Sequence, residues 1–169
     1  MTYSNAAIEL LKYFEQFRSH PYRDSAGVWT IGYGTTVGVT EHTAPMSEPD
    51  ALLKLTSGLS DRIKGLTFKN VLTQHQFDAC CVMIYNIGRP GFNTSTLARV
   101  LNGSGPKYVS RDMFTRWNKV TNPKTGLLEP VRGLTRRRNA EYLLFSTADS
   151  VMITSEVLSA WDRNGSFDV

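Results

Sequence analysis

The apolar positions at the start of the chain follow a helical period and then a strand period. Ile8, Leu11 and Phe14 recur at three-residue spacing, which predicts an amphipathic helix. Pro21 cannot continue that helix, because proline has no backbone N–H to donate. Residues 22–39 then alternate apolar and polar positions and are punctuated by glycine. This pattern predicts a short β-hairpin.

The rest of the chain has the pattern of a helical protein, with capping residues before the apolar periods and glycine after several of them. A stretch from Ala79 to Ile87 carries no charge, so its helix is expected in the middle of a core. Asn122–Gly126 reads as a turn, and residues 164–166 are expected to fray. The predicted helices cover residues 47–64, 73–87, 93–101, 110–117, 133–145 and 147–161.

Strands near the front and helices afterwards predict an α+β fold around one shared core. The length of 169 residues suits one domain or two small lobes, and 41% hydrophobic residues describe an ordinary globular protein. Cys80 and Cys81 are adjacent, so they point to different sides of a helix and cannot easily form a disulfide. They lack histidine partners at metal-ligand spacing, and we expect no metal site.

The net charge of +4 is concentrated in the second part of the chain. Residues 1–66 are nearly neutral, whereas residues 67–169 have an excess of lysine and arginine. A basic surface fits an anionic polymer, either nucleic acid or the bacterial envelope. No recognition-helix or RNA-binding signature accompanies the charge, so we expect no nucleic-acid partner.

Two carboxylates near the start have contrasting surroundings. Glu15 ends the first amphipathic pattern among apolar residues, a setting that favours the protonated carboxyl. Asp24 lies in a turn sequence, where a carboxylate stays wet and ionised. This contrast is the acid and base pattern of glycoside hydrolysis. Taken alone, however, such a pair is more typical of two solvated charges, because structural carboxylates far outnumber catalytic ones.

The string from Glu15 to Thr35, E-x-F-R-x-x-P-Y-x-D-x-x-G-x-x-T-I-G-Y-G-T, resembles the signature of the phage-type lysozymes, the endolysins of glycoside hydrolase family 24. The match includes Glu15, Asp24 and Thr30 without a gap. The resemblance extends over roughly residues 5–145, and the tail from Ser146 resembles no part of the family. Further blocks resemble the family in the same order, at residues 76–79, 85–88, 95–97, 116–119 and 133–138.

The resemblance implies a single lysozyme domain over residues 1–169. A small N-terminal lobe with a β-hairpin sheet would cover about residues 1–66, and a larger helical lobe about 67–145. The cleft would lie between the lobes, which a long helix joins. The role of the helical tail, residues 146–169, stays open.

The substrate implied by the resemblance is peptidoglycan, cut at the β-1,4 bond between N-acetylmuramic acid and N-acetylglucosamine. Glu15 would be the general acid. Asp24 would stabilise the developing positive charge and, with Thr30, hold a water on the opposite face of the sugar. This is the inverting arrangement, and it requires no metal and no cofactor.

Other residues of the family blocks are candidates for substrate binding. Tyr85 and Asn86 end the central helix on the side that faces the cleft in the family, and Ser95 would line the far side. A position of Tyr85 in the core is the open alternative. An arginine of the segment 136–138 contacts the acid in the family, and we predict that Arg136 contacts Glu15 here.

The first residues carry charges within their apolar pattern, at Glu9, Lys12 and Glu15, so we expect neither a signal peptide nor a membrane anchor. The protein would then stay in the host cytoplasm, as a monomer, until a separate holin releases it to the cell wall. A non-catalytic wall-binding module and a basic membrane-disrupting protein are the alternatives. Zymography, and lysis by heat-denatured protein, would distinguish them.

Overall fold

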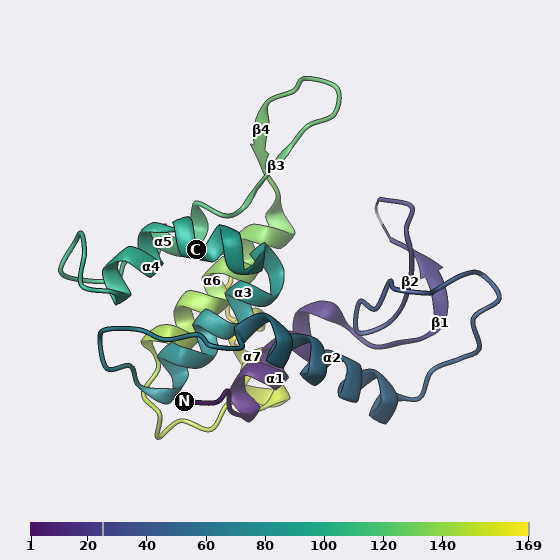
Figure 1. Cartoon of the computed structure of the whole chain (residues 1–169), viewed down its shortest axis with the longest axis horizontal. Coiled ribbons are helices and arrows are strands. Elements are labelled where there is room, and N and C mark those ends of the chain that lie inside the picture. Colours follow the sequence, from purple (N-terminus) through teal and green to yellow (C-terminus); the bar gives the residue numbers. More distant parts are fainter. Residues whose placement is uncertain (25, 169) are drawn as a thin grey trace.

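The computed structural model describes residues 1–24 and 26–168, and shows an α+β fold in which helices dominate (Figure 1). The strands form two antiparallel pairs, β1 with β2 and β3 with β4. The elements in chain order are α1 (Asn5–Glu15), β1 (Arg18–Arg23), β2 (Trp29–Gly32), α2 (Glu48–Ile63), α3 (Gln74–Thr94), α4 (Thr96–Leu101), α5 (Asp112–Thr115), β3 (Lys119–Thr121), β4 (Leu128–Pro130), α6 (Arg132–Ser146) and α7 (Ser155–Arg163).

The helix α1 ends at Glu15 because the next residue leaves the helical conformation. Gln16 has a φ of 52°, a value that is uncommon outside glycine. At the other end, the hydroxyl of Ser4 caps the helix by accepting the backbone N–H of Ala6. Glu15 therefore stands at the junction between α1 and the first strand.

The predicted β-hairpin is present, but its first strand starts earlier than the pattern suggests. Pro21 lies inside β1 rather than before it. A proline is tolerated there because β1 pairs with β2 alone, so one of its edges makes no ladder hydrogen bonds. At the end of β2, Gly32 has a φ of 66°, and a Cβ there would meet the side chain of Ala51 at 3.0 Å. The hairpin is thus packed closely on α2.

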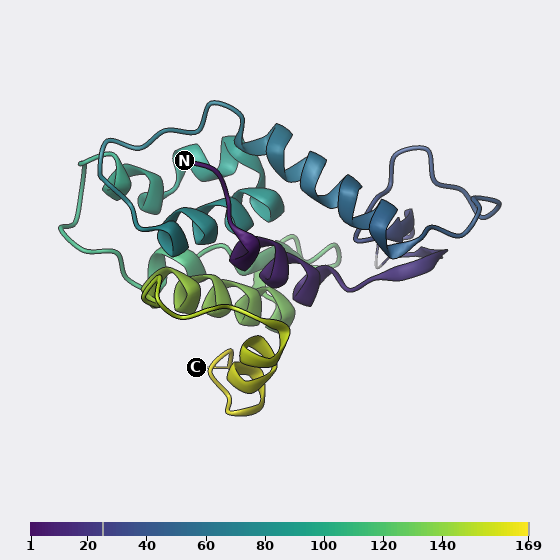
Figure 2. The same ribbon diagram turned by 90° about the horizontal axis from the view of Figure 1, so that it is seen from below.

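The helix α2 extends from the hairpin to the helical part of the molecule (Figures 1 and 2). Ser47 caps its start by accepting the backbone N–H of Asp50, as the sequence predicts. Ala51, Leu55 and Leu59 are buried on one face of the helix. This helix therefore connects the hairpin to the core formed around α3.

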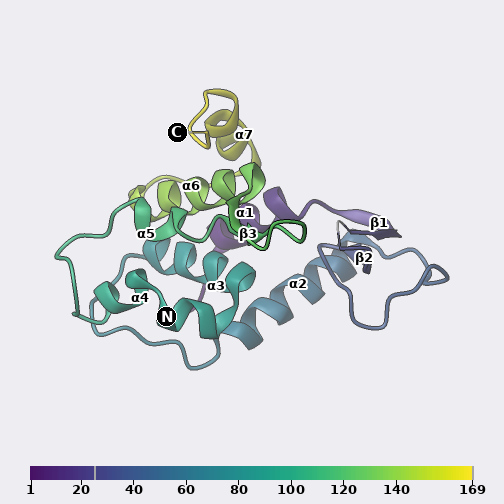
Figure 3. The same cartoon turned by 90° about the horizontal axis from the view of Figure 1, so that it is seen from above.

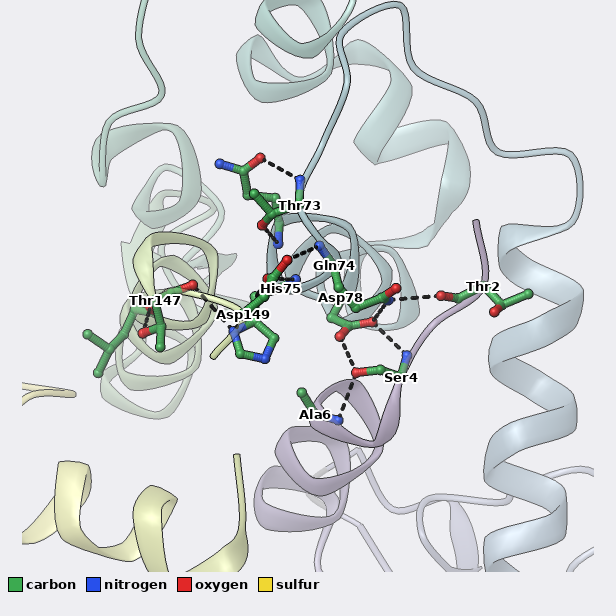
Figure 4. Close-up of polar contacts among 11 residues, drawn as sticks. Thr2, Ser4, Ala6, Thr73, Gln74, His75, Asp78, Thr147 and Asp149 are labelled. Carbon is green, nitrogen blue, oxygen red and sulfur yellow. Dashed lines mark hydrogen bonds and ion pairs between the residues drawn. The ribbon is translucent and has the colours of Figure 1, made fainter. Parts of the chain in front are cut away.

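Several polar groups hold the start of α3 (Figure 4). Thr73 and Gln76 form the predicted capping box. The carboxylate of Asp149, which follows α6, accepts the first two backbone N–H groups of α3 at 2.9 Å each. The buried carboxylate of Asp78 accepts the N–H of Ser4 at 2.8 Å. These contacts tie α3 to both α1 and the segment after α6.

The interior of α3 forms the centre of the core. Residues 79–84 are fully buried, which confirms the position predicted from their lack of charge. Cys80 and Cys81 are free and buried, as expected of small apolar side chains. Gly88, with φ 77° and ψ 159°, interrupts the helix near its predicted end, and a second helical segment continues to Thr94.

The hairpin formed by β3 and β4 was not predicted as strands. It flanks the predicted turn at residues 122–126 and projects from the helical body (Figure 1). Every residue of both strands is exposed. Because no face of this hairpin is buried, its sequence has no alternation of apolar and polar residues to reveal it.

The tail also differs from the prediction. Its helix, α7, begins at Ser155 and lies beside α1 (Figure 3). The expected fraying of residues 164–166 is wrong, because the backbone N–H groups of Asn164 and Ser166 donate to carbonyls of α7 at 3.1 and 2.9 Å. The next residue, Phe167, is fully buried. Its ring lies 5.8 Å from that of Tyr13 and 5.9 Å from that of Phe14, measured between centroids. The end of the chain is therefore part of the packing around α1.

Candidate active site

Glu15 is held at the end of α1 by an arginine of α6. Arg137 of α6 donates from Nη1 to Glu15 Oε1 at 2.7 Å, and the Arg137 guanidinium lies over the ring of Phe14. In the turn after β2, a Cβ on Gly34 would stand 3.4 Å from Glu15 Oε2. The Glu15 side chain keeps 21% of its surface exposed, so a ligand can still reach it.

The prediction that Arg136 contacts Glu15 is wrong. Arg136 faces the tail, where it forms ion pairs with Asp162 and, at 3.6 Å, with Asp168. The hydrogen bond to Asp162 raises the pKa of the Arg136 guanidinium above its ordinary value. Neighbouring residues of a helix are about 100° apart around its axis, so Arg137 points to α1 when Arg136 points to α7.

Asp24 lies in the turn at the end of β1, as its surrounding sequence predicts. Its Oδ1 accepts the backbone N–H of Ala26 at 2.9 Å and that of Val28 at 2.8 Å. Its own N–H donates to the Val28 carbonyl at 3.0 Å. The turn therefore fixes one oxygen of the carboxylate and orients the whole group.

Thr30 lies on β2, in register with Tyr22 of β1, and its side chain is buried. The hydroxyl donates to the carbonyl of Val28 at 3.0 Å. A hydroxyl that donates one hydrogen bond still has lone pairs to accept others. One short hairpin thus carries Asp24 and Thr30, and it directly follows the helix that ends at Glu15.

Tyr85 is half-buried on α3, under the guanidinium of Arg62, which lies 4.6 Å from the ring centroid. Burial raises the pKa of Tyr85, and the negative charge of Glu15 adds to that rise. The Glu15 carboxyl therefore lies near enough to the Tyr85 side chain to affect its ionisation. The structure supports both positions predicted for Tyr85: its ring packs against the core, and its side chain lies on the side of the acid.

Asn86 and Ser95, both predicted to bind substrate, line one cavity of about 600 Å³. The hydroxyl of Ser95 also caps α4, because it accepts the backbone N–H of Ala98 at 3.0 Å. The cavity lies between the end of α3, the start of α4 and the base of the β3–β4 hairpin. Its remaining lining residues are Ile87, Thr94, Thr96, Arg116, Trp117, Lys119, Leu128 and Leu134.

The sequence interpretation assigned no role to Trp117 or to the hairpin residues of this cavity. Trp117 lies in the block at residues 116–119 that resembles the family, and this resemblance could have marked it as a candidate for substrate binding. Leu128 had no signal, because it is separated from Trp117 along the chain and is exposed on a strand. Only the folding of the β3–β4 hairpin brings Leu128 to the cavity wall.

A buried charged network, also missed, lies behind Glu15 and Asn86. Arg138 donates from Nη2 to Asn86 Oδ1 at 2.8 Å. The same nitrogen lies 2.9 Å from Glu141 Oε1, and Arg137 Nε lies 3.5 Å from that oxygen. Burial raises the pKa of Glu141 and lowers that of Arg138. The spacing of these residues, within one helical turn, was the signal in the sequence.

Within residues 1–24 and 26–168, no group of three or more His, Cys, Asp or Glu side chains is placed to hold a metal ion. Over the same residues, no helix has the length and apolar character needed to cross a bilayer.

The geometry has a counterpart among known proteins. Residues 12–141 match the model of the phage lysozyme family. The chain belongs to that family. It is therefore an enzyme of the lysozyme type.

Individual relatives agree with this family. The endolysin of Acyrthosiphon pisum secondary endosymbiont phage 1 is 35% identical, over 88% of this chain and 100% of its own length. The endolysin of Escherichia coli O157:H7 phage FAHEc1 has a similar structure, with a TM-score of 0.79 and 30% identity over 91% of this chain and 98% of its own. The muramidase domain of SpmX from Asticaccaulis excentricus has a TM-score of 0.75 and 31% identity, over 87% of this chain and 99% of its own length.

Proposed function

We propose that this phage lysozyme is an endolysin that cuts the β-1,4 bond between N-acetylmuramic acid and N-acetylglucosamine with inversion at the anomeric carbon. The observation that carries the proposal is the position of Glu15. Its carboxyl is fixed by Arg137 and borders the turn after β2, on the hairpin that carries Asp24 and Thr30. The endolysin relatives support the substrate class.

Glu15 acts as the general acid and protonates the glycosidic oxygen as the bond breaks. Its carboxyl is partly shielded by the protein, and it stays open enough to reach a sugar. Arg137 fixes the direction of the carboxyl through Oε1, so Oε2 is the oxygen that faces the hairpin side.

Asp24 and Thr30 act on the opposite face of the sugar ring. The Asp24 carboxylate, oriented by two backbone N–H groups, stabilises the developing oxocarbenium charge. With Thr30 it also holds the attacking water. The threonine hydroxyl donates to a backbone carbonyl and so presents lone pairs, not its proton, to that water.

Substrate contacts beyond the reacting bond involve Asn86 and Ser95 along the cavity, and Tyr85 beside the acid. Asn86 uses its oxygen to accept from Arg138, so its NH₂ group is the part that can donate to a sugar hydroxyl or amide. The whole chain works as one domain, with the hairpin lobe and the helical lobe on opposite sides of the substrate.

Access to the cell wall requires a separate holin. The apolar residues of α1, among them Ala7, Leu10 and Leu11, are fully buried in the protein core. In the folded enzyme this surface is committed to packing and is not available to lipid. We therefore propose that the enzyme accumulates in the host cytoplasm as a monomer until a pore in the inner membrane releases it.

The test is digestion of purified peptidoglycan, with two readouts on the products. Mass spectrometry of the reducing ends should find N-acetylmuramic acid, whereas anhydro ends would indicate a transglycosylase. Proton NMR during the first minutes should show the α anomer ahead of mutarotation. An initial β anomer would mean retention and would overturn the inverting mechanism.

A further inference from the structure

Three charged side chains are buried together within about one turn of α6. Glu141 and Arg138 have no exposed surface, and Arg137 is 6% exposed. Burying a charge costs free energy that an ion pair repays only in part, so such a network is weak evidence for a stabilising role. The position of the network behind the active site suggests a different role.

The two arginines reach from Glu141 to different elements. Arg137 extends to Glu15 at the end of α1, at 2.7 Å. Arg138 extends to Asn86 on α3, at 2.8 Å. Glu141 Oε1 lies 2.9 Å from Arg138 and 3.5 Å from Arg137. The buried carboxylate of Glu141 therefore contacts two cations: Arg137, which holds Glu15, and Arg138, which holds Asn86 of the substrate cavity.

We propose that Glu141 is a positioning residue for the reaction, which holds Arg137 toward Glu15 and Arg138 toward Asn86 and shares the positive charge of Arg137. The inference rests on the proposed role of Glu15 as general acid. Glu141 itself is fully buried and does not touch the substrate.

The charge of Glu141 matters because a general acid has to keep its proton. Arg137 by itself favours the ionised form of Glu15. The carboxylate of Glu141, on the other side of Arg137, partly neutralises the guanidinium charge. Arg137 can then orient Glu15 with less electrostatic preference for the ionised carboxyl. Burial raises the pKa of Glu141, and the positive charges of the adjacent Arg138 and Arg137 oppose that rise.

Other titratable groups face the two carboxyls from the neighbouring elements. Tyr85 of α3 interacts with Glu15, and Arg62 of α2 lies over the Tyr85 ring. Burial raises the pKa of the Cys80 thiol, also on α3, and the negative charge of Glu141 adds to that rise. Tyr85 and Cys80 are therefore uncharged near neutral pH. Arg137 remains the cation in direct contact with Glu15.

The first test is the Glu141→Gln variant, which keeps the size and removes the charge. Activity of a general acid falls at high pH, where the acid loses its proton. Without Glu141, Arg137 acts more strongly on Glu15, and the alkaline limb of the kcat profile should move down by about one pH unit. Arg137→Gln should move that limb in the opposite direction.

A double variant tests whether Glu141 acts through Arg137. In the Arg137→Gln background, adding Glu141→Gln should leave the alkaline limb where Arg137→Gln alone puts it. This double variant removes one buried cation and one buried anion, so it stays charge-balanced. The double variant can be compared with Arg137→Gln even where Glu141→Gln alone does not fold. A further downward shift in the double variant would overturn the role through Arg137.

The matched control is Asp78→Asn, which neutralises another fully buried carboxylate on α3, one that bonds Ser4. It should lower stability without moving the limb. A ¹³C NMR titration of the Glu15 carboxyl compares wild type, Glu141→Gln and Asp78→Asn without an activity assay. The Glu15→Gln variant, which lacks this signal, assigns it. An inactive Glu15→Gln together with an unmoved limb and titration in Glu141→Gln would overturn this inference alone. An active Glu15→Gln would overturn the proposed function itself.

Discussion

At the scale of single residues, Glu15 is the group on which turnover should depend most. Glu15→Gln keeps the shape and can still accept from Arg137, but it has no proton to give at neutral pH. We expect turnover to fall by about 10²–10⁴-fold, the usual contribution of a general acid. Arg137 retains Glu141 as a partner, so the midpoint of thermal unfolding should change little. Peptidoglycan turbidity assays and calorimetry measure the two effects, and wild-type turnover would contradict the mechanism.

Asp24 provides a second test at this scale, because a matched carboxylate is available on the surface. Asp24→Asn should be severely impaired, since the neutral amide cannot stabilise positive charge at the anomeric carbon. Asp61 is exposed on α2, and Asp61→Asn should keep nearly full activity. The two variants should be compared in kcat on the same substrate. Equal losses would mean that Asp24 is an ordinary turn residue.

At the scale of elements, the tail stabilises α1 through one aromatic side chain. Phe167 is fully buried against Tyr13 and Phe14, so Phe167→Ala should lower the free energy of unfolding by about 3–5 kcal/mol. Leu127→Ala, in the exposed β3–β4 hairpin, is the control and should cost almost nothing. Urea denaturation measures both. A negligible effect at Phe167 would indicate that the tail does not pack on α1 in solution.

The junction between α3 and the segment after α6 should respond to acid through Asp149. The backbone N–H groups of His75 and Gln74 lower the pKa of Asp149 from its ordinary value of 3.8. A lowered pKa means that ionised Asp149 stabilises the native state above pH 3.8, and that this contribution is lost as the pH falls further. Asp149→Ala should therefore lower the thermal midpoint at pH 7. Its difference from wild type should shrink below pH 3.8, and a constant difference would contradict the ionic contribution.

At the scale of the whole molecule, the burial of the apolar face of α1 predicts the timing of lysis. An enzyme that needs a holin should accumulate in a Gram-negative host without lysing it, and should lyse the cells rapidly once chloroform opens the inner membrane. Culture turbidity follows both phases, with the inactive Glu15→Gln variant as the control. Prompt lysis without chloroform would show an export route through the chain itself.

Local features of this protein were determined by the sequence alone. The helix caps at Ser47 and Thr73, the hairpin after α1 and the placement of Glu15, Asp24 and Thr30 all depend on residues close together in the chain. Such contacts depend on backbone propensity and turn chemistry, which a short stretch of sequence contains. For the same reason the uncharged stretch within α3 could be placed in the core before its neighbours were known.

The tertiary structure decided what depends on distant partners. Arg136 and Arg137 are equivalent in the sequence, and only the rotation of α6 against α1 and α7 turns Arg137 toward Glu15 and Arg136 toward Asp162. Residues 164–166 resembled a frayed end, and only the structure shows that Phe167, which follows them, is buried against α1. In each case the free energy comes from surfaces brought together across more than twenty residues of chain. A local pattern contains no record of those surfaces.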